Sequence, residues 1–460
     1  MSQSDFHRQD VRHYLASYRA AHPEDVLTLN GAVSQDQDAT ALVFGLAAKG
    51  RAPLIEMTNV EGLGAKVLTN IFGCRTRIAR MFGTDVAGLH DAYQAAARRA
   101  VEPEEMTDAP VFEQVITENI DLNDLPMLKH FATDGAKYIT SGIILAEHPE
   151  TGVGNLSYHR SMINTPDTLA TSLHSRGHLW RLLNMAKEAG KPMPVAMIIG
   201  AHPLFMIAAS ARLAFGEDER SIAGGLLGEP LKVVRTPKYG LRVPAYAEMV
   251  LEGVIDPEAH VAEGPFGEFT GYSSDRSTNN LFRVETVMRR RDPILVSVTG
   301  GNSAEHLNLG RVPREAEMAE KIKQRFPSVT AMHYPASGTH FHAYVALNQQ
   351  RFGEARQVLM GILGWDPYLK TVIAVDSDVD ITRDEEVLWA MSTHFQPHRD
   401  VMIIDSLPGN ALDPSASGIG TTSRMGLDAT RGPDFHGVRA VIDDAAQARA
   451  AALLKAAGVS

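Results

Sequence analysis

Residues 263–272 read Glu263-Gly264-Pro265-Phe266-Gly267-Glu268-Phe269-Thr270-Gly271-Tyr272, with two carboxylates five positions apart. In a flat strand, residues at an odd separation point to opposite faces, so regular structure would part the two acids. The intervening Gly-Pro-Phe-Gly permits a folded backbone, because glycine adopts unusual angles and proline fixes one angle and lacks an N–H. Two acids in one pocket do not ionise independently, and the neutral one suits general acid catalysis. The same pattern also fits a surface turn with two solvated glutamates.

Short strand-like runs surround this turn, from about Val111 to about Val298. They are YITSGIILAEH (138–148), VAMIIGAH (195–202), LKVVRT (231–236) and ILVSVTG (294–300). One helix is expected over 178–190, where the apolar residues have helical spacing. Several short strands with few helices predict a partly open barrel or split sheet.

The N-terminal flank alternates helical and strand-like patterns. We expect a helix over 6–22, strands over 40–44 and 53–57, and an alanine-rich helix that ends near Ala100. The Pro-containing stretch 102–110 predicts a linker.

The C-terminal flank predicts a second α/β region after Pro313. Helix-like REAEMAEKIKQRF (314–326) is followed by strand-like TAMHYP, THFHAYVAL, TVIAVDSDVDI and DVMIIDS. The last segment, AAQARAAALLKAAG (445–458), is a strong helix former that either packs on a neighbour or contributes to a subunit contact. The predicted fold is α/β (α+β), with an N-terminal α/β domain (1–105), a central split β-barrel domain (106–312) and a C-terminal α/β domain with the terminal helix (313–460).

The composition excludes several classes of protein. A chain of 460 residues implies two or three domains. The net charge of −11 argues against a nucleic-acid-binding surface, and the basic run Arg289-Arg290-Arg291 is interpreted as a solvated turn. No apolar run approaches the roughly 20 residues of a membrane span, and the polar N-terminus is not a secretory signal. The single cysteine, Cys74, allows no intrachain disulfide, which favours a cytoplasmic location, and is interpreted as a small buried side chain.

Two polar segments could hold an anion or a metal ion. Residues 154–160 read GNLSYHR, and residues 172–178 read SLHSRGH directly before the expected helix. A Ser/Gly-rich approach to a helix N-terminus suits anions, although an ordinary N-cap gives the same pattern. Ala208-Ala209-Ser210 then precedes an acidic loop, 216–219. Asn, His and Glu side chains form a plausible ligand set for a divalent ion that also binds phosphate.

Taken together, these segments resemble the UbiD family of decarboxylases, which use prenylated FMN. The resemblance covers about residues 30–435 and is densest in NLSYHR, SLHSRGH, ERSIAGGLLGEPLKVVR, EGPFGEFTGY and SRMGLDAT. It implies a flavin-binding-like central domain and a catalytic Glu-Arg-Glu set formed by Arg160, Glu263 and Glu268. It also implies a metal site of Asn155, His178 and Glu219, because Glu219 precedes Ala223-Gly224 by four positions, whereas Glu217 and Glu229 do not fit.

The cofactors that the resemblance implies are prenylated FMN, Mn²⁺ or Mg²⁺, and K⁺. The implied cofactor-binding residues are Asn155, Ser157, Tyr158, His159, Arg160, Ser172, His174, Ser175, Gly177, His178, Ser210 and Arg424. At position 424 an arginine stands where the family usually has lysine, which keeps the positive charge for a cofactor phosphate but changes its geometry. Gly177, directly before His178, and Arg212, between Ser210 and Glu219, make the cofactor contacts in these two loops less clear than the three metal ligands.

The implied reaction is reversible, non-oxidative decarboxylation of an aromatic or heteroaromatic acid. Loss of CO₂ leaves electron density on carbon, so a cofactor must accept it and an acid must deliver a proton. We expect Glu268 to be the proton donor and Arg160 to hold Glu263 and orient the substrate carboxylate.

Polar residues after the 294–300 strand are expected to line the substrate pocket. His306, Asn308 and Arg314 could bind a ring heteroatom, a hydroxyl or a second carboxylate, which favours a furoate-, pyrrole- or hydroxybenzoate-type acid over cinnamate. His306 could equally be structural. Four further histidines are interpreted as structural or exposed: His340, His342, His394 and His398.

Two other functions stay open: a redox flavoprotein with ordinary FMN, and a non-catalytic binding or assembly protein of UbiD-like fold. The expected partners are the small-molecule acid and a flavin prenyltransferase that supplies the cofactor. The family also implies a homodimer or larger homo-oligomer formed through the C-terminal region.

Overall fold

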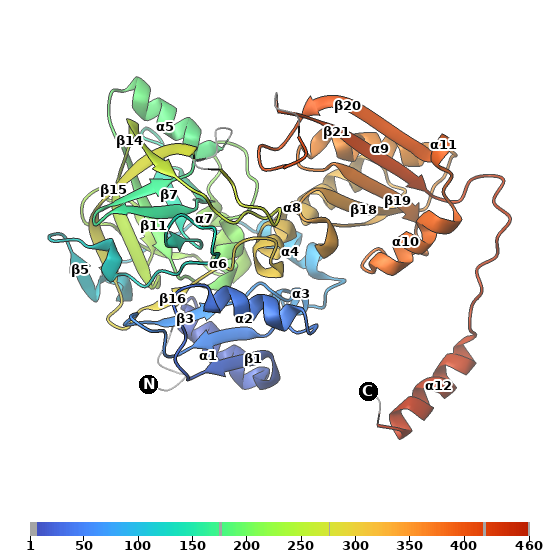
Figure 1. Ribbon diagram of the computed structural model, residues 1–460, viewed down its shortest axis with the longest axis horizontal. Helices are drawn as coiled ribbons and strands as arrows, with labels where there is room; N and C mark the ends of the chain where they lie inside the picture. Colours follow the sequence, from blue (N-terminus) through green and yellow to red (C-terminus); the bar gives the residue numbers. More distant parts are fainter. Residues whose placement is uncertain (1–6, 174–176, 276, 417–419, 459–460) are drawn as a thin grey trace.

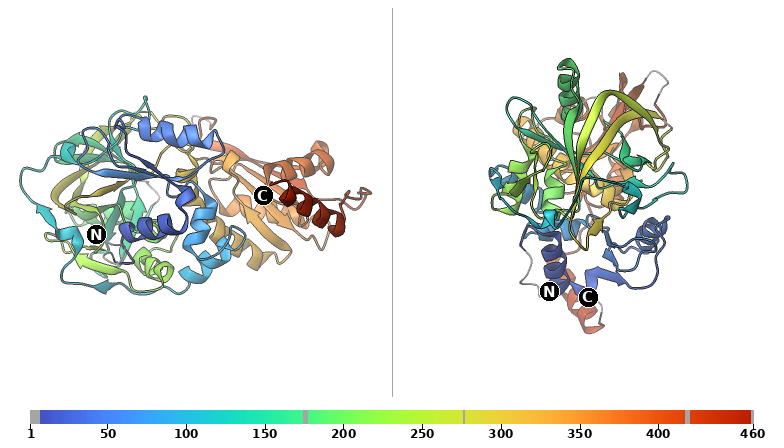
Figure 2. Two further views of the ribbon diagram at one scale, coloured as in Figure 1. Left: turned by 90° about the horizontal axis from the view of Figure 1, so that it is seen from below. Right: turned by 90° about the vertical axis from the view of Figure 1, so that its left-hand side faces the viewer.

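The computed structural model describes residues 7–173, 177–275, 277–416 and 420–458. It has mixed helices and strands in four sheets, which confirms the α/β (α+β) fold class. Figure 1 shows the N-terminal elements beside a central barrel, a separate C-terminal sheet with its helices, and a terminal helix that stands away from both. In the right-hand view of Figure 2 the N-terminal elements lie below the barrel.

The N-terminal sheet is completed by a strand from far along the chain. Its order is β1 (Val26–Leu29), β2 (Leu54–Met57), β3 (Lys66–Thr69) and β16 (Ile294–Val296). β16 pairs parallel with β3, so the sheet is completed by a strand that follows the barrel in the sequence. The helices of this part are α1 (Val11–Ala21), α2 (Asp38–Ala47), α3 (Arg75–Met81) and α4 (Leu89–Ala97), and Pro23–Asp25 forms a 3₁₀ turn, η2.

The expected strand over 40–44 is wrong, because these residues lie in α2. Ala39, Thr40 and Val43 are its buried residues, and their spacing of one, three and four places them on one helical face. Short apolar runs do not distinguish a strand from a buried helix segment. The expected helix over 6–22 and strand over 53–57 are confirmed as α1 and β2.

The central barrel is a nine-stranded sheet in the order β6-β9-β10-β15-β14-β11-β7-β8, with β5 paired to β15. Its longest element is the antiparallel hairpin of β14 (Met249–Glu263) and β15 (Ser277–Arg289), and the two-acid turn lies at the tip of this hairpin. The other strands are β5 (Gln114–Ile116), β6 (Tyr138–Ile139), β7 (Ile143–Glu147), β8 (Gly154–Tyr158), β9 (Ser161–Thr165), β10 (Thr168–Thr171) and β11 (Met193–Ile199).

Three helices and a small sheet surround the barrel. The helices are α5 (His178–Glu188), α6 (Pro203–Ala208) and α7 (Glu219–Leu227), and Pro110–Phe112 and Leu122–Asp124 form the 3₁₀ turns η3 and η4. The small sheet has the order β13 (Arg242–Pro244), β12 (Lys232–Arg235), β4 (Glu104–Glu105). β4 comes from the expected linker 102–110, which therefore pairs with the central part instead of running free.

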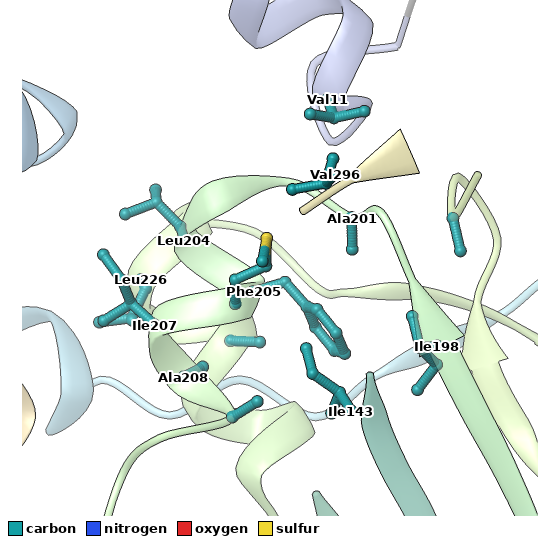
Figure 3. Packing of buried hydrophobic residues seen from close by; sticks show 14 of the residues in the cluster. Val11, Ile143, Ile198, Ala201, Leu204, Phe205, Ile207, Ala208, Leu226 and Val296 are labelled. Carbon is teal, nitrogen blue, oxygen red and sulfur yellow. The ribbon is translucent and has the colours of Figure 1, made fainter. Parts of the chain in front are cut away.

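One core joins the N-terminal and central parts. All six residues of α6 are buried, and they pack between α1 and the barrel strands. Figure 3 shows Phe205 of α6 beside Ile143, with Val11 and Val296 on the far side of the same cluster. A helix that is apolar on all sides must be covered on all sides, and residues of both parts share the core cluster that covers α6.

The first residues of the chain also reach the barrel through an ion pair. Arg290 is 7% exposed and binds Asp10, the N-cap of α1, at 2.5 Å. The interpretation of Arg289-Arg290-Arg291 as a solvated turn is therefore wrong for its middle residue. Cys74, expected to be buried, is half-buried at the start of α3.

The C-terminal sheet has the order β17-β18-β19-β21-β20 and is covered on both faces. Alternate residues of β19 enter different cores: Val372 and Ala374 pack with α8 and α9, and Ile373 and Val375 pack with α10. The elements are α8 (Ala304–Arg325), β17 (Val329–His333), η5 (Ala336–Gly338), β18 (His342–Leu347), α9 (Glu354–Trp365), β19 (Thr371–Asp376), α10 (Asp384–Thr393), α11 (Pro397–Asp400), β20 (Val401–Pro408), β21 (Thr421–Ala429) and α12 (Asp444–Ala456).

Helix α8 begins ten residues before the expected start, so Pro313 lies inside it. A proline in a helix cannot donate to the carbonyl four residues earlier, here Leu309. The Ser210 hydroxyl lies 2.8 Å from that carbonyl oxygen and 2.8 Å from Ile207 O, and its one hydrogen is shared between them. A side chain from the central part thus faces the carbonyl that Pro313 leaves without its backbone donor.

None of the helices in the described ranges combines the length and apolar character needed to cross a membrane.

A buried histidine connects the parts that meet at β16. His130 is 2% exposed, and its ring nitrogens lie 2.9 Å from the Thr40 hydroxyl and 3.3 Å from the Ser297 hydroxyl. Burial lowers the pKa of His130 to about 4, because the charged ring would lose its hydration.

We predict that His130→Gln flattens the pH dependence of stability. Unfolded His130 takes up a proton near its ordinary pKa of 6.5 while the folded ring does not, so the wild type loses stability as pH falls from 6.5 to about 4. This group contributes about 3 kcal/mol to that loss. Urea unfolding across this pH range measures the slope, and exposed His398→Gln is the control. An identical slope in His130→Gln and wild type would refute the assignment.

Candidate active site

The turn at the tip of the β14–β15 hairpin is held by a second loop, 130–135. Asp134 accepts from Gly267 N at 2.9 Å, and Gly135 N donates to Pro265 O at 2.8 Å. Gly264 has a φ of 97°, which favours glycine, and a Cβ at Gly267 would overlap the ring of Phe131. The glycines of this motif are therefore required by backbone angle and by close packing.

Arg160 joins the two carboxylates of the turn. It lies between β8 and β9, and its Nε and Nη2 each donate to Glu263 at 2.9 Å. Its Nη1 forms an ion pair with Glu268. The backbone between Glu263 and Glu268 thus folds so that both acids reach one guanidinium, as the sequence predicted.

Both acids are withdrawn from water. Glu263 is fully buried, and Glu268 is 6% exposed. The ring of Phe266 lies 5.2 Å from the Arg160 guanidinium carbon and 4.6 Å from the ring of Tyr138. Ionic interactions and hydrogen bonds are stronger in such surroundings than in water. The few groups that contact Glu263 and Glu268 therefore control proton transfer here.

Two residues that the sequence did not indicate also bind Glu263. The Tyr138 hydroxyl donates to Oε1 at 2.8 Å, and Asn279 Nδ2 donates to Oε2 at 2.8 Å. Tyr138 lies in β6 and Asn279 in β15. In the sequence Tyr138 is only one residue of a strand-like run and Asn279 one of two successive asparagines, so nothing marked either.

Two of the three proposed metal ligands lie together. Glu219 begins α7, is 2% exposed, and accepts from Leu156 N at 2.9 Å and Asn155 Nδ2 at 3.2 Å. The Asn155 Oδ1 atom is buried without a hydrogen-bond partner. Burial raises the pKa of Glu219 to about 7, because its charge is desolvated. An unpartnered amide oxygen beside a buried carboxylate fits a hard divalent cation.

His178 begins α5, and its ring lies 5.5 Å from that of Phe215. No hydrogen bond or ion pair joins it to Asn155 or Glu219 in the described ranges, and no three His, Cys, Asp or Glu residues there are close enough to hold a metal ion. Asn155 and Glu219 lie together, and the place of His178 in the metal set stays a prediction.

Three of the proposed cofactor-binding residues, Ser157, His159 and Ser172, are linked by hydrogen bonds. Ser157 Oγ lies 2.8 Å from His159 Nε2, and His159 Nδ1 lies 2.9 Å from Ser172 O. The Tyr158 hydroxyl donates to Met206 O at 2.8 Å, and Ser210 binds α8 as described above. Gly177 is the N-cap of α5. His174 and Ser175 lie outside the described residues.

Arg424 lies in β21, away from these residues. Its guanidinium donates to the main-chain carbonyls of Leu363, Asp366, Pro367 and Pro408. The structure thus assigns it a role in the C-terminal domain, and its contact with a cofactor phosphate stays a prediction.

The proposed substrate-pocket residues all lie on α8 and all have protein partners. His306 Nδ1 lies 2.9 Å from Gly301 O, and Asn308 donates to Phe72 O at 2.9 Å. Arg314 binds Asp366 through two contacts of 2.5 and 2.6 Å. The sequence could not show these partners, because they come from other parts of the chain.

Positive charge accumulates beside the turn. We call Arg212, Arg311 and Arg314, which lie around His340, the cationic cluster; burial and these arginines hold the pKa of His340 well below its usual range, so its ring is neutral. The ring of Phe269, next to Glu268, lies 4.8 Å from that of His340, which had been interpreted as structural or exposed. Arg311 is 1% exposed and, among the described residues, has no carboxylate within ion-pair distance; burial lowers its pKa to about 10. Of these three arginines, only Arg314 forms an ion pair within the described part of the chain, with Asp366, so the cluster fits an anion.

We predict that Gly267→Ala destabilises the protein by about 1–3 kcal/mol, because the new methyl group displaces Phe131 and the turn. Gly45→Ala is the matched control, since a Cβ at Gly45 meets no atom within 4 Å. Guanidinium unfolding measures both variants. Equal stability of Gly267→Ala and wild type would show that the turn is not tightly packed.

Three family models match the chain in order. They describe the N-terminal, Rift-related and C-terminal domains of 3-octaprenyl-4-hydroxybenzoate carboxy-lyase and match residues 19–97, 104–303 and 307–429. Two anhydromevalonate phosphate decarboxylases are similar in sequence. The one from Aeropyrum pernix is 33% identical over 82% of this chain and 84% of its own length. The one from Methanosarcina mazei is 31% identical over 87% and 93%.

Solved structures match over almost the whole chain. The UbiD-class enzyme HmfF from Pelotomaculum thermopropionicum, in complex with FMN, has a TM-score of 0.89 and 33% identity over 95% of this chain and 98% of its own. An evolved dimeric form of it, in complex with prenylated FMN, has a TM-score of 0.85 and 31% identity over 95% and 100%. The closed form of vanillic acid decarboxylase from Sedimentibacter hydroxybenzoicus has a TM-score of 0.85 and 27% identity over 98% and 100%.

The three domain models match in order along the chain, and a solved UbiD-class structure shares its fold over almost the whole length, so the chain belongs to the UbiD family of decarboxylases.

Proposed function

We propose that this protein decarboxylates an aromatic or heteroaromatic acid reversibly, with prenylated FMN as its cofactor. The observation that carries the proposal is the buried set in which one arginine, Arg160, binds both Glu263 and Glu268. A surface turn with two solvated glutamates would not bury both acids against one cation.

The cofactor would supply the electron sink that side chains lack. The unpartnered Asn155 Oδ1 beside buried Glu219 fits a cation that binds the cofactor phosphate. Mn²⁺ or Mg²⁺ suits these oxygen ligands, with His178 as a third ligand, and K⁺ is a further expectation from the family. The residues proposed to hold the cofactor are Asn155, Ser157, Tyr158, His159, Arg160, Ser172, His174, Ser175, Gly177, His178, Ser210 and Arg424.

The chain's own residues would bind the acid and move one proton. Arg160 donates to carboxylates through a rigid fork, so it can orient the carboxylate of the substrate while it holds the two glutamates. Glu268 would deliver the proton that replaces CO₂ at carbon. The near-complete burial of both acids excludes water from this step.

The cationic cluster supports a substrate with a second polar or anionic group. Arg314 belongs to this cluster, and His306 and Asn308 lie on the same helix, α8. A heteroaromatic acid with a second carboxylate would use the unpaired positive charge. A phosphate-bearing unsaturated acid is the second candidate, because the relatives from Aeropyrum pernix and Methanosarcina mazei are decarboxylases of anhydromevalonate phosphate.

We also propose a cytoplasmic homo-oligomer that receives its cofactor from a flavin prenyltransferase. α12 contains no buried residue, and Val438, Val441, Ile442, Leu453 and Leu454 expose apolar side chains along the C-terminal arm. A second copy of the chain would cover this surface. The evolved form of HmfF is dimeric, which supports the same arrangement here.

The decisive experiment is production with a flavin prenyltransferase, purification without oxygen, and measurement of CO₂ release. The acids tested are aromatic monoacids, heteroaromatic diacids and phosphate-bearing unsaturated acids. We expect turnover of at least one class, and mass spectrometry should show the prenylated flavin. No CO₂ from any class with that cofactor bound would refute the proposal. Bound ordinary FMN with reversible bleaching would support the redox alternative.

We predict that Glu268→Gln retains the cofactor but lowers kcat by about a hundredfold to ten-thousandfold, because the amide cannot deliver the proton. Glu258→Gln, an exposed glutamate of the same hairpin, is the matched control and should keep wild-type activity. Unchanged decarboxylation by Glu268→Gln would remove Glu268 from the role.

We predict that Glu219→Gln loses the divalent ion and with it the flavin. The amide oxygen still accepts from Leu156 N, so the fold is retained, but the ligand charge is gone. The loss of metal affinity should be at least about tenfold to a hundredfold. Elemental analysis and the flavin absorbance of the purified protein measure it. Exposed Glu217→Gln should keep both, and full metal content in Glu219→Gln would exclude Glu219 as a ligand.

A further inference from the structure

Glu263 receives four hydrogen bonds, one for each of its lone-pair directions. Arg160 donates one to each oxygen at 2.9 Å. Tyr138 donates to Oε1 and Asn279 to Oε2, both at 2.8 Å. A protonated carboxyl group would have to point its own hydrogen at a donor, so this arrangement fits only the carboxylate.

Glu268 has much less support. In the described residues its carboxylate has one charged partner, Arg160 Nη1, and its backbone bonds to Gly271 and Tyr272 fix only the turn. Arg160 gives Glu268 only Nη1, because Nε and Nη2 donate to Glu263, and the second hydrogens of Nη1 and Nη2 remain for a substrate carboxylate. Of the two acids, only Glu268 can take up and release a proton without leaving a buried donor unpaired.

The two extra donors to Glu263 are fixed by the barrel. Tyr138 is 2% exposed, its ring packs on Phe266 at 4.6 Å, and its hydroxyl also lies 3.3 Å from Pro265 O. Asn279 lies on β15 opposite Val261 and is also bonded to Ser277 Oγ at 3.0 Å. Burial, together with Glu263, raises the pKa of Tyr138, so its hydroxyl keeps the proton it donates.

We propose that Tyr138 and Asn279 are positioning residues that hold Glu263 as a permanent carboxylate and so reserve proton transfer for Glu268. The role rests on the proposed decarboxylation, since it concerns the proton of that reaction. With either donor removed, Glu263 competes with Glu268 for the proton, and Arg160 loses its fixed orientation.

The kinetic test uses Tyr138→Phe and Asn279→Ala. We expect kcat to fall about tenfold to a hundredfold, with KM within about twofold, because the acids are misplaced but the substrate still binds. The acidic limb of the kcat–pH profile should move to higher pH, since Glu263 is protonated more easily without its donor. A structural role alone would lower thermal stability without moving that limb.

The matched controls remove the same groups elsewhere in the barrel. The Tyr239 hydroxyl donates to Glu285 at 2.6 Å, so Tyr239→Phe deletes a tyrosine–carboxylate bond that does not touch Arg160 or either acid. Asn280→Ala deletes the neighbouring amide, which points to the opposite face of β15. Both controls should keep the wild-type pH profile.

A second measurement needs no turnover. Infrared difference spectra of apoprotein, with the spectrum of Glu263→Gln subtracted, isolate the Glu263 carboxyl band. The ionised band should persist to lower pH in wild type than in Tyr138→Phe or Asn279→Ala. The proposal would be overturned if the Glu263 carboxyl band had the same position and the same pH dependence in wild type, both variants and both controls. If no acid is decarboxylated but the infrared difference is present, the proposed reaction fails, while the finding that Tyr138 and Asn279 hold Glu263 as a carboxylate stands.

Discussion

The paired hydrogen bonds between Arg160 and Glu263 are the interaction on which the site depends. A buried carboxylate is costly unless it is paired, and a half-buried arginine between two strands needs a partner to fix its fork. Their pairing closes the hairpin tip against β8 and β9 and leaves one guanidinium nitrogen for Glu268. The unequal support of the two acids follows from this geometry: one acid has four donors and the other has one charged contact.

The surrounding fold is built from segments that are distant in sequence. β16 completes the N-terminal sheet, Arg290 binds the cap of α1, and α6 packs between both parts. At the other end of the barrel, Ser210 faces the α8 carbonyl that Pro313 leaves without its backbone donor. The loops that carry the acids, the proposed metal ligands and the cationic cluster are therefore fixed relative to one another by long-range contacts.

Much of the site could be predicted because its residues lie close together in short sequence motifs. Gly267 is required by close packing and Gly264 by its positive φ, so the turn in EGPFGEF could be predicted from the sequence. Residues whose partners are remote could not be predicted in the same way. The expected strand over 40–44 is helical because its buried face is set by neighbouring elements. Arg314 and Asn308, expected at the substrate, are bound to Asp366 and Phe72.

The sequence by itself determined the family, the fold class and the three residues Arg160, Glu263 and Glu268 that the structure brings together. These features depend on local patterns: strand and helix periodicity, turn glycines and short motifs. Only the tertiary structure decided that Tyr138 and Asn279 complete the bonds of Glu263, that Arg311 is buried with no ion pair among the described residues, and that His340 lies beside Phe269. The physical reason is that a buried charge is defined by its partners, and those partners come from strands and helices that meet only when the chain folds.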